Sequence, residues 1–122
     1  MLKIVKCNMP DNFKEDYTDE ELTEYDLKDL SQDIEELYYW YGGGSYCGTG
    51  NAVYKTQKGR WEHAGLSHCS CNGPTDGLDV ITGHGYDTWQ ELVSMFSGEL
   101  LEECASIIEA LKSREEECKA KS

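Results

Sequence analysis

The sequence lacks several features that would place it in a large functional class. No stretch approaches 18 consecutive apolar residues, so we predict no membrane-spanning helix. The opening residues 1–8 contain no apolar run long enough for a secretory signal, and we expect a cytoplasmic protein. Basic residues are scarce, because 11 Lys and Arg oppose 24 Asp and Glu, a net charge of 11 − 24 = −13. A polyanion repels DNA and RNA, so we expect no direct binding of nucleic acid.

Two nucleotide-binding patterns are also missing. The Gly-Lys-Ser/Thr phosphate loop is absent, and Gly42, Gly44 and Gly48 precede an expected strand rather than the helix that a dinucleotide loop requires. We therefore interpret these glycines as a hairpin turn. The sequence contains no internal repeat and no low-complexity linker. Its length suits one domain, which we predict over 1–122.

The acidic residues that are present concentrate in one stretch. Residues 11–36 contain twelve acids and two bases, a net charge of −10. Residues 1–10 contribute +2, residues 37–97 contribute −2 and residues 98–122 contribute −3. Such a stretch is either a solvated face that only improves solubility or a surface that binds a basic partner.

Periodicity and capping patterns predict an α+β fold. Residues 34–41, 49–56 and 60–66 have the composition of strands, and the turns between them favour a three-stranded antiparallel meander. Residues 2–5 add a possible fourth strand at an edge. Capping-box patterns begin at Thr18 and Thr88, which predicts an acidic surface helix near 19–30 and a helix near 89–96 that ends at Gly98. Apolar residues three and four apart predict a longer helix over 99–117, and we expect the last two helices to cover the sheet.

Aromatic residues are unusually dense in the expected sheet. Because side chains alternate across a strand, the run from Tyr38 to Tyr41 must place rings on both faces. One face is expected to be core beneath the helices. Rings on the other face are candidate interface anchors, although each individual ring is expected to pack in the core.

A second cluster of chemically active residues follows the meander. His68, Cys69 and Cys71 are the densest group of possible metal ligands, with Cys47 and His63 close enough in the meander to contribute. Zinc sites usually pair two Cys-x2-Cys knuckles, whereas this sequence has one Cys-x-Cys. The alternatives are a zinc- or thiol-dependent site and a compact turn without a metal. We predict reduced cysteines, no cofactor and no catalytic residue, since nothing in the sequence places an orienting partner for a Cys–His pair.

The segments Tyr39-Trp40-Tyr41, Gly44 to Gly50 and His68-Cys69-Ser70-Cys71-Asn72-Gly73-Pro74 resemble a family of small uncharacterised proteins encoded by bacteriophages and prophages. The resemblance covers residues 34–80. The chain departs from the pattern with Asn72 at an aromatic position and Cys47 at a polar or acidic one. This resemblance implies a phage origin but no established activity.

Small, acidic, phage-encoded proteins are often inhibitors of host defence, including anti-CRISPR proteins. By analogy with that class we expect a non-enzymatic inhibitor that binds a basic host protein, such as a CRISPR nuclease, and blocks its handling of nucleic acid. The alternatives are the metal- or thiol-dependent protein and a phage accessory protein with no inhibitory role. The predicted partner-binding residues are eight acids of the segment 15–36: Asp16, Asp19, Glu20, Glu24, Asp26, Asp29, Asp33 and Glu36.

Overall fold

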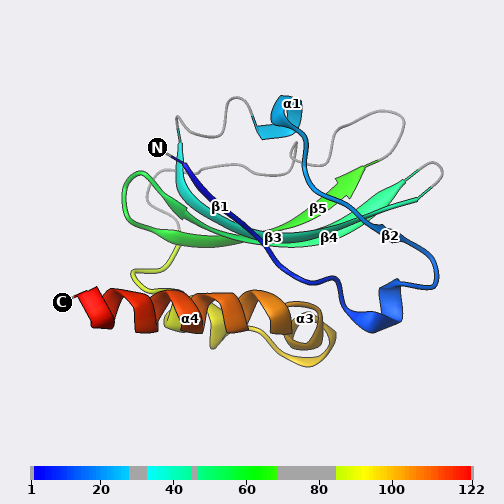
Figure 1. The fold of residues 1–122 in the computed structure, drawn as a ribbon. Helices are drawn as coiled ribbons and strands as arrows, with labels where there is room; N and C mark the ends of the chain where they lie inside the picture. The colour runs from blue at the N-terminus through cyan, green and yellow to red at the C-terminus, as the bar shows by residue number, and fades with distance from the viewer. Residues whose placement is uncertain (1, 28–32, 45–46, 69–84, 122) are drawn as a thin grey trace.

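The computed structural model describes residues 2–27, 33–44, 47–68 and 85–121 of the 122-residue chain (Figure 1). Its centre is an antiparallel meander of β3 (Ile34–Gly43), β4 (Gly48–Thr56) and β5 (Trp61–His68), in the order β3-β4-β5. Tyr38 lies opposite Val53, and Val53 lies opposite His63. The predicted meander and the α+β class are therefore confirmed.

The turns of the meander depend on the residues that sequence analysis assigned to them. Gly43 pairs with Gly48, and the amide of Gly44 donates to the Cys47 carbonyl at 2.6 Å, which closes the first hairpin. The second hairpin contains Gly59, whose φ of +81° lies in the left-handed region that favours glycine. The glycines at 42–48 thus form a hairpin, as expected.

The N-terminal strand joins the sheet differently from the prediction. β1 (Lys3–Lys6) does lie at the edge, but it pairs with β3 in parallel, so the sheet is mixed rather than fully antiparallel. The long connection between β1 and β3 permits this orientation, because parallel neighbours require a crossover of a dozen or more residues. Within that connection, β2 (Thr18–Asp19) pairs antiparallel with Gly42 and Gly43.

The predicted acidic helix over 19–30 is wrong in its first part. Thr18 and Asp19 are strand residues, and the described helix α1 spans only Glu24–Leu27. The Glu20 amide donates to the Tyr41 carbonyl at 2.9 Å, and the Leu22 amide donates to the Tyr39 hydroxyl at 3.0 Å. These long-range bonds to β3 outweigh the local capping pattern at Thr18, which is worth only about 1 kcal/mol.

The C-terminal helices also differ in detail. α2 (Trp89–Val93) begins as predicted, since the Thr88 hydroxyl accepts from the Glu91 amide at 3.1 Å. The predicted helix over 99–117 is divided into α3 (Gly98–Glu103) and α4 (Ala105–Lys121), with the buried Cys104 between them at φ −96° and ψ 7°. Gly98, predicted to end the preceding helix, instead begins α3. None of the described helices is long and apolar enough to cross a membrane.

Both faces of the sheet are buried. Figure 1 shows α4 on one side of the sheet and α1 on the other. The rings of Tyr38, Trp40 and Trp61 pack with α2 and α4 in one core cluster, whereas Tyr39, Tyr41 and Tyr54 pack with Leu22 in a second. All six rings are at most 6% exposed, so each of them packs in a core as expected, and the alternative that some of them are exposed interface anchors is wrong.

A buried ion pair fixes α4 to the sheet. The guanidinium of Arg114 donates to both carboxylate oxygens of Glu36 at 2.7 and 3.0 Å, and the Tyr38 hydroxyl donates to the same carboxylate. Burial raises the pKa of Glu36, but the hydrogen bonds from Arg114 and Tyr38 and the charges of Arg114 and Lys55 outweigh it and lower that pKa. Arg114 also lies over the Trp61 ring at 5.3 Å.

Removing one partner of this pair should destabilise the fold strongly. The substitution Arg114→Met removes both hydrogen bonds from the guanidinium to the buried Glu36 carboxylate and leaves Lys55, 3.9 Å away, as its remaining counter-charge. We expect the free energy of unfolding to fall by about 3 kcal/mol. Urea denaturation followed by circular dichroism measures the loss. The double variant Glu36→Gln with Arg114→Met should recover part of it, because a neutral amide then replaces the buried carboxylate. A loss below about 1 kcal/mol in the single variant contradicts this assignment.

Candidate functional site: a carboxylate groove

The segment that follows β1 forms one wall of a small groove. After Cys7 the chain makes a single 3₁₀ turn, Asp11–Phe13, in which the Phe13 amide donates to the Pro10 carbonyl at 3.1 Å. The half-buried Phe13 ring packs against the Trp40 ring, with their centroids 5.1 Å apart. The turn is therefore anchored on the face of the sheet that the C-terminal helices cover.

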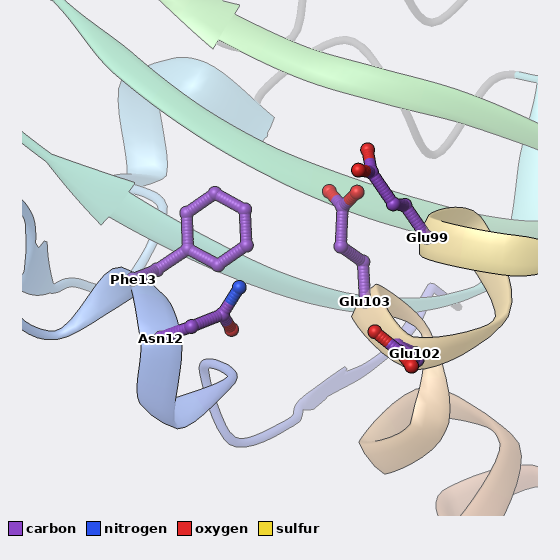
Figure 2. A pocket seen from close by; sticks show the side chains of 5 residues that line it. All are labelled: Asn12, Phe13, Glu99, Glu102 and Glu103. Carbon is purple, nitrogen blue, oxygen red and sulfur yellow. The ribbon is translucent and has the colours of Figure 1, made fainter.

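The opposite wall is α3. The fully buried Trp40 indole donates to the Glu103 carbonyl at 2.7 Å, which holds the C-terminal end of α3 on the sheet. Glu99, Glu102 and Glu103 face Asn12 and Phe13 across a cavity of about 220 Å³ (Figure 2). We call the cavity lined by these five residues the carboxylate groove. Small-molecule sites usually enclose about 300–1,000 Å³, so this groove has room for a side chain rather than for a whole metabolite.

One wall of the groove continues into a partly buried series of hydrogen-bonded side chains. The Asn51 side-chain amide donates to Glu103 Oε1 at 3.2 Å, and Asn51 Oδ1 lies 2.9 Å from His63 Nε2. The His63 ring packs edge-on against Phe96, with their centroids 5.2 Å apart. Burial lowers the pKa of His63, so the imidazole is neutral at neutral pH.

The predicted partner-binding acids are spread over more than one surface. Asp16, Glu20, Glu24 and Asp33 are exposed. Asp19 is also exposed and pairs with Lys6 at 3.0 Å. Asp26 belongs to α1, but its side chain and the whole of Asp29 lie outside the described residues. Figure 1 shows α1, which contains Glu24, on the opposite side of the sheet from α4. The predicted acids therefore do not form one helix face.

Glu36 was predicted to bind a partner, and the structure contradicts this. The residue is 7% exposed, and its carboxylate is bound by Arg114 and Tyr38. Alternation along β3 explains the error, since Glu36 shares a sheet face with Tyr38 and Trp40 beneath α4. Its role is to hold the helix.

The predicted metal cluster is only partly described. His68 is the last residue of β5, and its backbone pairs with that of Gly48. The exposed Cys47 directly precedes Gly48 in the sequence. Cys69 and Cys71 lie outside the described residues. His63 is five positions earlier on β5 and contacts Asn51 and Phe96. Among the described side chains, no group of three or more His, Cys, Asp or Glu could hold a metal ion. The zinc alternative stays a prediction.

Sequence reasoning missed the α3 wall of the groove. Residues 98–122 contain seven acids, but four bases reduce the net charge of this segment to −3. The net charge of the segment therefore gave no indication of an acidic cluster. The spacing of Glu99, Glu102 and Glu103, three and four residues apart, places them on one helix face and was the available signal. Nothing in the sequence indicated that this face would meet Asn12 and Phe13.

Comparison of the chain with protein-family models, with curated proteins and with solved structures finds no match.

The neutral His63 makes stability depend on pH in a defined window. Its pKa in the folded protein lies below the ordinary value of 6.5, so His63 binds a proton more readily in the unfolded chain than in the folded one. The free energy of unfolding therefore falls as the pH drops below about 6.5. Urea denaturation at pH 7, 6 and 5 should show this fall. The variant His63→Gln keeps an N–H donor but does not titrate, and its stability should fall less over the same range. Equal slopes for the two proteins would contradict the assignment.

The buried cysteines should resist alkylation. Burial raises the pKa of Cys7 to about 11 and that of Cys104 to about 12, so the reactive thiolate is rare at neutral pH. Iodoacetamide at pH 8 should modify the exposed Cys47, whereas Cys7 and Cys104 should react only after the protein is unfolded in urea. Peptide mass spectrometry identifies the modified residues. Equally rapid labelling of Cys7 and Cys47 would contradict the packing of Cys7.

Proposed function

We propose that the chain is an acidic, non-enzymatic inhibitor that binds the basic surface of a nucleic-acid-handling protein through the carboxylate groove and the exposed acids beside it. One observation supports this above all. Three glutamates of α3 line one cavity opposite Asn12 and Phe13, and its lining residues include no lysine or arginine. A net charge of −13 adds long-range attraction to a basic partner.

The chemistry of the lining favours a basic side chain as the occupant. Carboxylates form strong charge-assisted hydrogen bonds with arginine, which can be bidentate. The Phe13 ring offers a flat apolar surface on which a guanidinium can lie. An arginine or lysine that normally contacts a phosphate would therefore find acceptors of the same charge here.

The resemblance to phage proteins suggests the class of target. An inhibitor of host defence acts in the cytoplasm of the host cell, where its partner would be a basic protein such as a CRISPR nuclease. By occupying the channel that holds nucleic acid, the chain would prevent binding or cleavage. The choice of this target class follows by analogy with other small, acidic phage inhibitors.

Charge reversal tests the proposal with a matched control. The groove variant carries Asp16→Lys, Glu99→Lys and Glu102→Lys. The control variant carries Glu91→Lys, Glu109→Lys and Glu116→Lys, three acids that are likewise exposed but lie on α2 and α4. Both variants change the net charge by the same amount, to −13 + 6 = −7. Binding of fluorescent duplex DNA to a panel of CRISPR effector complexes is then followed by anisotropy.

We expect the wild-type chain and the control variant to displace DNA from an effector, and the groove variant to require at least tenfold more protein. Raising the salt from 50 to 300 mM should weaken inhibition, because exposed charges are screened over about 8–10 Å at ordinary ionic strength. Equal inhibition by both variants would show that only total charge matters. No inhibition of any effector by the wild-type chain would favour the accessory-protein alternative.

The metal- or thiol-dependent alternative rests on His68, Cys69 and Cys71. Elemental analysis of protein purified without added metal distinguishes it. Stoichiometric zinc that is lost with chelator, together with a lower melting temperature, would support it. Substoichiometric metal and indifference to chelator would remove it.

A further inference from the structure

Glu103 differs from the other glutamates of the carboxylate groove in how it is held. Its carbonyl accepts from the Trp40 indole at 2.7 Å, and its Oε1 accepts from the Asn51 amide at 3.2 Å. The backbone and the side chain of this residue are therefore both tied to the sheet. One oxygen of the carboxylate is occupied, and Oε2 is left for a ligand in the groove.

The orientation of Asn51 is set in turn by His63. A carboxylate can only accept, so Asn51 must present its amide nitrogen to Glu103 and its oxygen to His63. His63 must then donate from Nε2, which defines the tautomer of the neutral ring. Asn51 is only 6% exposed, and the His63 ring packs against Phe96, so neither side chain can reorient freely.

We propose that Asn51 and His63 are positioning residues that hold the Glu103 carboxylate ready for a basic side chain of the partner. The inference rests on the proposed function and adds a specific mechanism to it. A glutamate on a helix surface loses side-chain freedom when it binds, whereas a glutamate that is already oriented loses less. The difference is worth up to roughly tenfold in affinity.

The test uses a labelled hexa-arginine peptide as the probe, with the full chain at pH 8. His63→Gln keeps an N–H donor for Asn51 Oδ1, whereas His63→Leu, of similar size, does not. Both carry the same charge as the neutral wild-type histidine, so a difference between them cannot come from electrostatic steering. Asn51→Val removes the donor to Glu103 without changing the net charge, and Glu103→Gln keeps that hydrogen bond but removes the carboxylate.

We expect His63→Gln to bind like the wild-type chain. His63→Leu should bind about threefold more weakly, and Asn51→Val and Glu103→Gln about tenfold more weakly. The loss in His63→Leu and Asn51→Val should be in the dissociation rate measured by stopped flow, because the long-range field that steers association is unchanged. Thermal unfolding shows that each variant is folded at the temperature of the measurement. If Asn51→Val does not fold, the two His63 variants decide the question.

The results that would contradict the positioning role differ from those that would contradict the proposed function. Equal affinities for His63→Gln and His63→Leu overturn the positioning role and leave the proposed function intact. If the wild-type chain does not bind hexa-arginine, or the charge-reversed groove variant binds it equally well, the proposed function itself fails. An effect of His63→Leu on association alone also overturns the positioning role.

Discussion

The hydrogen bond from the Trp40 indole to the Glu103 carbonyl is the interaction on which the rest of the functional surface depends. Trp40 is fully buried in β3, so its N–H needs a partner inside the protein. The carbonyl at the end of α3 supplies one, and this contact brings α3 down onto the sheet. Because Phe13 packs against the same indole, one side chain positions both walls of the carboxylate groove.

The second fixed point lies toward the other end of β3. There Glu36 and Arg114 hold α4, with Tyr38 donating to the same carboxylate and Trp61 beneath the guanidinium. A buried ion pair of this kind adds little net stability compared with apolar packing, but breaking it is costly, so it acts mainly to specify where the helix lies. Because the helix is interrupted at Cys104, the Trp40 contact can hold α3 while the Glu36–Arg114 pair holds α4.

The acidic character of the protein is divided by these constraints into different roles. Glu36 is structural, Asp19 is paired with Lys6, and Glu103 is oriented by Asn51. The exposed acids Asp16, Glu99 and Glu102 remain available for a partner. Our proposal of an inhibitor depends on this last group and on the oriented Glu103, so it concerns a small part of the total charge of −13.

The sequence by itself determined the meander, its hairpin glycines and the start of α2, because these depend on neighbouring residues and on side-chain periodicity. It also predicted the exposure of Asp16, Glu20, Glu24 and Asp33. The tertiary structure alone decided the parallel pairing of β1, the replacement of a helix start by β2, the burial of Glu36 and the meeting of Phe13 with α3. These features depend on bonds between residues that are distant in the chain, such as Glu20 with Tyr41 and Trp40 with Glu103. Local propensities are worth about 1 kcal/mol or less, and such long-range bonds and buried contacts override them.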